Sequence, residues 1–278
     1  MRLAGQVSSR MMPQQRVAHQ RARGAASLEV AAHGLARLAQ AAPLRVLFPT
    51  PEPGAPLEAA FVNVAGGLAG GDALEARITL RAEAAALVTT PAAEKVYRSL
   101  GDVSSIATRI EVAADAVLEY LPQEAILFDG ARLSRRMEAE VAPGATLLAA
   151  ESVVLGRIAR GEAWRHGDLS DTWRLRREGR LVWADALALE AAGRDAPFGL
   201  DGADSLGTIL LCAEDAARHR DLARELTEGA ASVVRPGLLL LRFLGTAGGV
   251  RLSMASAIRA MRAAALGRPA VLPRLWTC

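Results

Sequence analysis

The stretch Leu74-Glu75-Ala76-Arg77-Ile78-Thr79-Leu80-Arg81 decides the fold class, because apolar and polar residues alternate along it without a break. A period of two predicts a strand with one buried and one exposed face. Similar runs, separated by turn residues such as Pro143-Gly144, recur at residues 44–48, 87–90, 109–112, 117–121, 133–141, 146–155, 172–176 and 181–190. Many short strands at this spacing indicate a sheet stack, a barrel or a β-helix. We therefore predict a mainly β protein with a stacked, β-helix-like strand arrangement.

The C-terminal third changes character and predicts two α-helices. Residues 214–228 have acids in the first turn, Leu222 and Leu226 four apart, and Gly229 as a stop. A second helix is expected to be capped by Ser253 and to end at Gly267, with residues 238–244 forming a buried strand between the two helices. We expect a flexible lead-in over residues 1–24 and a single domain over 25–278. This domain divides into a β core (about 25–205) and an α+β part (about 206–278) that packs on it.

Composition excludes several functional classes. The 278 residues carry a net charge of +3, with acids and bases interleaved, so no block of like charge indicates a nucleic-acid-binding arm. No apolar run approaches the roughly 18 residues that span a bilayer, and the N-terminus lacks the apolar segment of a secretory signal. Two cysteines, Cys212 and Cys278, form neither a disulfide framework nor a CxxC metal site. We expect a cytoplasmic protein that binds neither nucleic acid nor membrane.

Two further patterns argue against catalysis. The glycine cluster at residues 66–72, GGLAGGD, lacks the GKS or GKT of a phosphate-binding loop and lies between two strands. Close backbone approach or positive φ angles explain its glycines better. The four histidines are not paired at metal-ligand spacing, and none lies beside a serine or cysteine in a nucleophile motif. No catalytic residue and no tightly bound cofactor is predicted.

Three carboxylates fall on the apolar face of a predicted strand. Glu119 shares its face with Val117 and Leu121, Glu151 with Leu147 and Val153, and Asp185 with Leu181, Trp183, Leu187 and Leu189. A carboxylate on a buried face is costly unless it is paired, hydrated or in a polar channel. Structural ion pairs with the abundant arginines are one explanation. A polar interior path that handles a divalent metal transiently is the other. Lys95, the only lysine in the chain, has either a local role or none.

Several motifs in order resemble one protein family. They are the glycine cluster with Asp72, TTPAAEKVYRS at 89–99, LEYLPQEAILF at 118–128, Leu155-Gly156-Arg157 with Gly161-Glu162, and LPRLWT at 272–277. Together they resemble the urease accessory protein UreD (also called UreH), from about residue 43 to the C-terminus. The N-terminal part departs from the family, because it is rich in Ala and Arg and has Pro49-Thr50-Pro51-Glu52 where the family has a tyrosine. The contacts of this part therefore stay open.

The resemblance implies a non-enzymatic protein of mainly β fold with two helices late in the chain. Family members bind apo-urease and recruit UreF and the nickel-carrying GTPase UreG, so that nickel reaches the urease active site. Transient Ni2+ is expected along a route through the protein, with Asp72, Glu151 and Asp185 as the residues of this path. By motif position, the resemblance marks Asp72, Lys95, Glu151 and Asp185, together with Glu94, Gly70, Gly71, Glu119, Gln123, Glu124 and Arg157.

One expectation tests the nickel route, and one alternative function is weighed against the accessory role. Asp185→Leu should preserve folding and partner binding but lower urease activation. The alternative is a stand-alone β-helical carbohydrate-active enzyme with paired carboxylates. Only four tryptophans are available as sugar-stacking platforms, and no two acids are set as acid and nucleophile.

Overall fold

Seventeen strands in two sheets make up most of the computed structural model, which describes residues 21–50, 54–197 and 199–277. The seven-stranded sheet has the order β14 (Arg180–Glu190), β13 (Asp168–Arg177), β11 (Arg132–Val141), β8 (Ser104–Val112), β5 (Ala73–Leu80), β1 (Arg23–Ala31) and β2 (Gly34–Ala41). The ten-stranded sheet has the order β16 (Ala231–Arg235), β17 (Leu238–Gly245), β15 (Ser205–Cys212), β12 (Thr146–Leu155), β9 (Val117–Leu121), β6 (Ala85–Thr89), β4 (Leu57–Asn63) and β3 (Leu44–Leu47). Its remaining strands are β7 (Glu94–Val96) and β10 (Ala125–Leu127).

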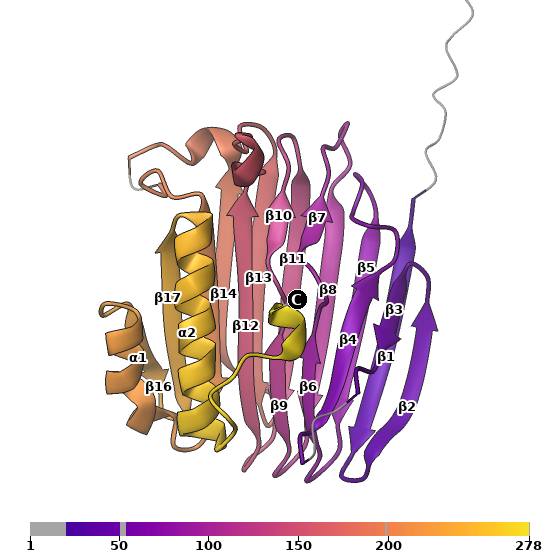
Figure 1. Cartoon of the computed structure of the whole chain (residues 1–278), viewed down its shortest axis with the longest axis vertical. Coiled ribbons are helices and arrows are strands. Elements are labelled where there is room, and N and C mark those ends of the chain that lie inside the picture. The colour runs from indigo at the N-terminus through magenta and orange to yellow at the C-terminus, as the bar shows by residue number, and fades with distance from the viewer. Residues whose placement is uncertain (1–20, 51–53, 198, 278) are drawn as a thin grey trace, which may run out of the picture.

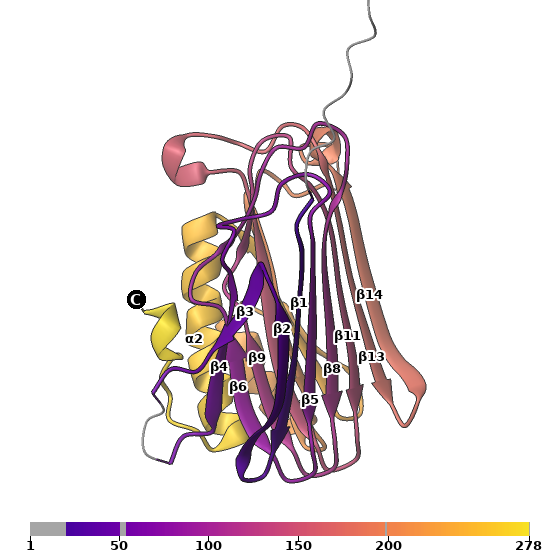
Figure 2. The same cartoon turned by 90° about the vertical axis from the view of Figure 1, so that its right-hand side faces the viewer.

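The chain forms a β-solenoid of about four turns, because it passes alternately from one sheet to the other. Parallel, in-register neighbours result, as between β5 and β8, where Ala73 pairs with Ser105 and Leu80 with Val112. The two sheets face each other as layers, with the helices on the outer side of the ten-stranded sheet (Figures 1 and 2). The alternation in residues 74–81 follows from this arrangement, since Leu74, Ile78 and Leu80 are buried whereas Glu75 and Arg77 are exposed. The predicted fold class is confirmed.

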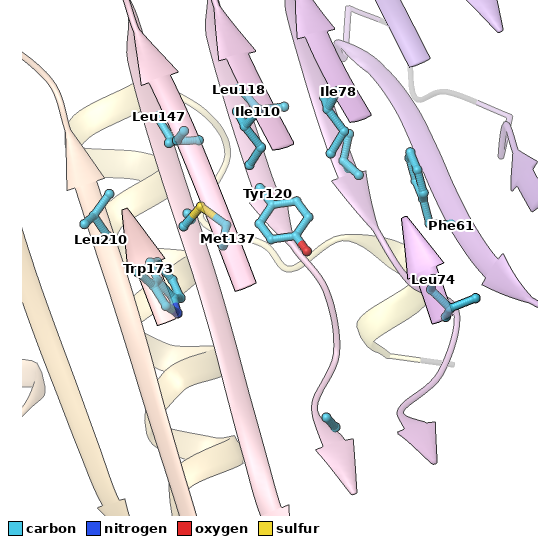
Figure 3. Packing of buried hydrophobic residues seen from close by; sticks show 14 of the residues in the cluster. Phe61, Leu74, Ile78, Ile110, Leu118, Tyr120, Met137, Leu147, Trp173 and Leu210 are labelled. Atoms are coloured by element: carbon cyan, nitrogen blue, oxygen red, sulfur yellow. The ribbon is translucent and has the colours of Figure 1, made fainter. Parts of the chain in front are cut away.

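Apolar side chains from both sheets fill the space between the layers. Ile78, Ile110, Met137 and Trp173 extend from the seven-stranded sheet to meet Leu118, Leu147 and Leu210 of the other (Figure 3). Burying such side chains contributes roughly 1.5–3 kcal/mol each before the entropy of ordering them is counted. Scarce aromatic residues are compensated by leucine, valine and alanine, as the composition requires.

Both helices lie in the C-terminal region, and α2 builds a second apolar layer. Helix α2 (Ala247–Leu266) packs on β15 and β17, where Met254, Ile258 and Met261 are buried against the outer side of the sheet. Helix α1 (Arg220–Leu226) is shorter than predicted, because residues 216–219 form a 3₁₀ turn. Within the described ranges, no helix has both the length and the apolar character needed to cross a bilayer.

The start of α2 corrects one prediction. The helix begins six residues before Ser253 and is capped by Thr246, whose hydroxyl accepts a hydrogen bond from the Gly249 backbone N–H. Its end at Gly267, with φ of 59°, is as predicted. At the other end of the chain, β1 begins at Arg23, inside the predicted lead-in, and residues 1–20 lie outside the described residues.

Candidate functional site

Three of the sequence motifs meet side by side in the ten-stranded sheet. Strand β7 pairs in parallel with β10, and β10 pairs with the end of β12. The short strands β7 and β10 lie where the alternation had predicted no strand. Because successive side chains on a strand point to opposite faces, Glu94 lines a cavity between the sheets while Lys95 lines the outer surface. The motifs therefore build a site with an inner and an outer side.

The outer side is a surface depression of about 610 Å³, which we call the motif depression. The Tyr97 and Phe128 rings form its aromatic wall, edge to face with centroids 5.1 Å apart, and the Arg157 guanidinium lies 4.5 Å from the centroid of Phe128. Arg157 is paired with Glu162, whereas Lys95 and Arg160 make no ion pair with any described residue. The depression thus combines exposed aromatic surface with two available cations.

The glycine cluster supports this surface. A side chain at Gly67, which has φ of 149°, would place its Cβ 2.5 Å from the Tyr97 ring and 2.8 Å from the Lys95 carbonyl oxygen. The neighbouring Leu68 bridges Val96, and the Tyr97 hydroxyl donates to the Gly66 carbonyl at 2.9 Å. Close approach and positive φ, rather than phosphate binding, explain these glycines, as predicted. At the same end of the cluster, a Cβ at Gly70 would meet the Ser99 side chain, and one at Gly71 the Arg21 side chain.

Asp72 closes the turn that follows the glycines. One carboxylate oxygen accepts from the Ala22 backbone N–H at 2.7 Å, and the other accepts from Ala69 N–H at 2.8 Å. Both oxygens are therefore used by the backbone, and the buried side chain fixes the start of β5 next to β1.

The inner side is a cavity of about 90 Å³ between the two sheets, which we call the interior cavity. Glu94 lines it and accepts a hydrogen bond from the Asn63 side-chain amide at 2.9 Å. Deeper and fully buried groups are Thr108, Tyr120, Arg135 and Glu151. The predicted path residue Glu151 therefore does lie in the interior, where it lines the same cavity as a second carboxylate, Glu94.

A polar network joins the two sheets around Glu151. Its carboxylate accepts from the Tyr120 hydroxyl at 3.3 Å and lies 3.4 Å from Arg135 Nε. Figure 3 shows the Tyr120 ring among the apolar side chains between the sheets. Arg135 donates two hydrogen bonds to Asp171, of 3.1 and 2.5 Å, and so belongs mainly to that carboxylate. One oxygen of Glu151 has no hydrogen-bond donor among the described residues.

Burial shifts the acidity of both cavity carboxylates in the same direction. Desolvation raises the pKa of Glu94 to about 7, although the Asn63 hydrogen bond and the Lys95 charge oppose it. Desolvation also raises the pKa of Glu151 to about 7, helped by the Asp171 charge and opposed by Arg135. Each carboxylate can therefore exchange a proton near neutral pH.

The remaining predicted acids lie apart from this cavity. Glu119 faces the opposite side of the sheet, where its carboxylate pairs with Arg262 of α2 at 2.5 Å. Asp185 lies on the edge strand β14, half-buried, and pairs with Arg242 at 2.6 Å. The structure thus does not bring Asp72, Glu119, Glu151 and Asp185 together. Within the described part of the chain, no three His, Cys, Asp or Glu side chains are grouped closely enough to hold a metal ion.

Gln123 and Glu124 fix the C-terminal end of the chain instead of lining a metal path. The Gln123 amide donates to the Leu275 carbonyl at 2.7 Å, and Glu124 pairs with Arg251 of α2 at 2.5 Å. Sequence reasoning missed Arg135 and Asp171, whose signal was available. Each falls on the apolar phase of its strand, next to Leu133 and Trp173 respectively.

Comparison with known proteins agrees with the motifs. The family model described as UreD urease accessory protein matches residues 19–277. The chain belongs to the UreD family. It is 49% identical over 238 residues to a urease accessory protein UreD of Granulibacter bethesdensis, covering 83% of this chain and 99% of that protein. It is 38% identical over 284 residues to the UreD of Paracoccus denitrificans, covering 99% and 98%.

Membership in the UreD family identifies a urease accessory protein, which takes part in urease maturation and nickel insertion and is not an enzyme. The resemblance stated from the motifs is confirmed. The alternative of a carbohydrate-active enzyme is wrong, because the match runs through the whole β-solenoid and not through one motif.

Proposed function

We propose that this chain binds apo-urease, recruits UreF and UreG, and offers the interior cavity as a route for nickel during GTP-dependent delivery. The pair of buried carboxylates, Glu94 and Glu151, supports the route most directly. The simplest test deletes the gene from a urease-producing host. Urease protein should then be present but nickel-free, and active, nickel-loaded urease after deletion would refute the proposal.

The chemistry of the cavity suits passage better than storage. A tight site needs several deprotonated ligands held at fixed geometry. The lining of the cavity includes two carboxylates and the neutral hydroxyl groups of Thr108 and Tyr120. Because each carboxylate has a pKa of about 7, either can release a proton to accept a cation and take it back afterwards. We assign Asp72 and Asp185, which lie outside the cavity, to turn closure and to the Arg242 ion pair.

Glutamine substitutions test the route. Glu94→Gln with Glu151→Gln removes both titratable groups at nearly constant volume and should leave co-purification with urease and UreF unchanged. Nickel bound per urease, measured by elemental analysis, should fall severalfold. Glu111→Gln, an exposed acid on the outer face of β8, is the matched control and should have no effect. Normal nickel content in the double variant, with a loss in Asp185→Leu, would instead move the route to the β14 edge.

We further propose the motif depression as a partner-docking surface. Lys95 and Arg160 are cations without an ion pair among the described residues, and Tyr97 and Ile158 are exposed beside them. Aromatic and arginine side chains are enriched in protein interfaces. An acidic partner segment with an apolar anchor fits this surface. The double variant Lys95→Glu with Arg160→Glu should co-purify with less partner protein than the wild type, whereas Arg174→Glu, on the opposite sheet, should co-purify with as much. Equal partner recovery with the wild type, the double variant and Arg174→Glu would refute this surface.

A further inference from the structure

The seven-stranded sheet ends at β14, and the outer backbone edge of this strand is unpaired. From Trp183 to Glu190, β14 pairs with β13 on one side, and its backbone forms no hydrogen bond with any other described residue. The Arg235 guanidinium reaches the strand only at its bulge, where it donates to the Val182 carbonyl at 3.0 Å. Alternate N–H and C=O groups of an edge strand point away from the sheet. Beyond the bulge, β14 therefore presents an open row of backbone donors and acceptors.

The inward side chains of β14 show that this edge is incompletely covered. Trp183 and Leu187 are only half-buried, whereas Trp173 and Leu175 on the neighbouring β13 are buried. Both pairs lie on the same face of one sheet, so the difference comes from the missing neighbour beyond β14. Edge strands often carry lysine or proline that discourages further pairing, and β14 contains neither. Its one inward charge, Asp185, is neutralised by Arg242 at 2.6 Å.

The ten-stranded sheet extends beyond the edge of the seven-stranded sheet. In Figure 1, β17 and β16 lie further left than β14, which is the last strand of its own sheet, so their inner face has no strand opposite it. Leu240 and Arg242 lie on this inner face of β17, because Phe243 faces α2. The Arg242 side chain is accordingly 43% exposed. We call this step between the sheets the β14 ledge, and it consists of Val182, Trp183, Asp185, Leu187, Leu240 and Arg242.

The shape of the ledge admits a single strand but not a second copy of the chain. A copy that paired through its own β14 would lie one strand spacing away, about 4.8 Å. The two-fold axis between antiparallel neighbours is perpendicular to the sheet, so both ten-stranded sheets would lie on the same side. The overhanging β16 and β17 of the two copies would then collide. An extended segment meets no such obstacle, because its backbone pairs with β14 while alternate side chains rest on β17.

The charges around the ledge indicate which segment fits it. Arg180, at the start of β14, and Arg235, on β16, form no ion pair with a described residue, and Arg235 contacts the backbone two residues from Arg180. The ledge thus has two available cations at one end and the apolar Trp183 and Leu187 along its length. We propose that an extended segment of a partner protein adds to β14 as an eighth, antiparallel strand, with acidic residues at the Arg180 end and alternating apolar side chains facing β17. This surface is separate from the motif depression and does not depend on the nickel route.

A designed peptide tests the pairing on the full-length protein. The probe is a labelled nonapeptide of alternating valine and threonine that ends in two glutamates, and its control ends in two lysines. Fluorescence anisotropy should show saturable binding of the acidic peptide and about fivefold weaker binding of the lysine peptide. Hydrogen exchange followed by mass spectrometry should slow in residues 183–190 when the acidic peptide is bound. Absence of saturable binding, or protection confined to other strands, would overturn the proposal.

Variants separate the ledge from the rest of the surface. Leu187→Lys places an inward charge on the edge strand and should abolish binding of the acidic peptide. Arg180→Glu, at an exposed position, should weaken the acidic peptide and strengthen the lysine peptide, so it decides the question even if Leu187→Lys does not fold. Leu35→Lys is the matched control, because Leu35 is exposed on β2, the edge strand at the other end of the same sheet. It should bind as the wild type does.

Two results would contradict the assignment of the ledge to a partner segment. The first is equal affinity of the wild type, Leu187→Lys, Arg180→Glu and Leu35→Lys for the acidic peptide, which would place the peptide elsewhere. The second is a concentration-dependent dimer in sedimentation velocity that Leu187→Lys dissociates and Leu35→Lys does not. That dimer would assign the open edge of β14 to a second copy of this chain.

Discussion

At the residue scale, Glu151 is buried beside an arginine and still has a pKa of about 7, because Arg135 is committed to Asp171. The Arg135–Asp171 pair is nearly neutral as seen from Glu151, so desolvation decides the shift. The sequence could not decide whether a buried acid forms a structural ion pair or remains a titratable carboxylate. Both occur in this one network, because Arg135 forms the ion pair with Asp171 and Glu151 remains the titratable carboxylate.

The raised pKa of Glu151 has a defined effect on stability. In the folded protein Glu151 keeps its proton up to about pH 7, whereas an unfolded glutamate loses it near pH 4.5. The stabilising contribution of Glu151 to the free energy of unfolding is therefore complete below pH 4.5 and is lost as the pH rises through 7. A shift of this size corresponds to about 3 kcal/mol. Glu151→Gln should match the wild type in urea unfolding at pH 4 and exceed its unfolding free energy by up to about 3 kcal/mol at pH 8. Glu111→Gln should show no such gain, and an unchanged pH slope in Glu151→Gln would contradict the assignment.

Removing Arg135 should have the opposite effect. Arg135→Met leaves Asp171 and Glu151 buried without a cation, which costs roughly 3–5 kcal/mol when one partner of a buried pair is lost. Urea unfolding at pH 7 measures the loss. The exposed Arg136→Met, on the next position of the same strand, should change stability by less than about 1 kcal/mol. Equal stability of the two variants would mean that the network contributes nothing.

Sequence alternation correctly showed which residues share a strand face with Glu119 and Glu151, but it could not show which of the two faces points into the cavity. Both faces of β9 and β12 are buried, one between the sheets and one under α2, so Glu119 and Glu151 look alike in the sequence and lie on opposite faces. Asp185 does share a face with Trp183, as predicted, yet Leu181 is 49% exposed. A bulge opposite Leu175 and Arg176 inserts one residue and reverses the phase there.

At the scale of elements, the glycine cluster is a support for β7, and this gives a testable prediction. Gly67→Ala combines an unfavourable φ with a clash against Tyr97, whereas Gly101→Ala has a similar φ of 153° and no neighbour within 4 Å. Strained φ alone costs about 1–3 kcal/mol. Gly67→Ala should lower Tm further than Gly101→Ala and should weaken partner recovery as well, because Lys95 and Tyr97 are displaced together. Identical Tm values for Gly67→Ala and Gly101→Ala would show that Gly67 has no packing role.

The limits of prediction at this scale have local causes. Strand ends at 117–121 and 146–155 were correct because alternation and turn residues agree there. Helix α2 was predicted too short because Gly248 and Gly249 are poor helix formers, and the Thr246 cap and packing on β15 outweigh their cost. Strands β7 and β10 span only three residues each, too few for a period to be recognised.

At the scale of the whole molecule, the outer face of the seven-stranded sheet is open, whereas that of the ten-stranded sheet is covered by α2 and by residues 268–277, which we call the C-terminal strap (Figure 2). The strap carries the last sequence motif, residues 272–277, and packs it against the end of β9 and against α2. The Trp276 indole donates to the Leu121 carbonyl at 2.9 Å, and the Arg251 guanidinium lies 5.6 Å from the ring centroid. The two apolar layers on either side of the ten-stranded sheet are thereby tied to the same loop between β9 and β10.

This coupling predicts that the strap stabilises the whole fold and not only its own end. Trp276 is 7% exposed, so Trp276→Ala removes a buried aromatic side chain and leaves the Leu121 carbonyl without its donor, with an expected loss of about 3–5 kcal/mol. Trp276→Phe keeps most of the packing and should lose only about 1 kcal/mol. Urea unfolding followed by far-UV and near-UV circular dichroism should give one coincident transition in all three proteins. A separate early transition in Trp276→Ala, with the main one unmoved, would show that the strap and α2 unfold independently of the solenoid.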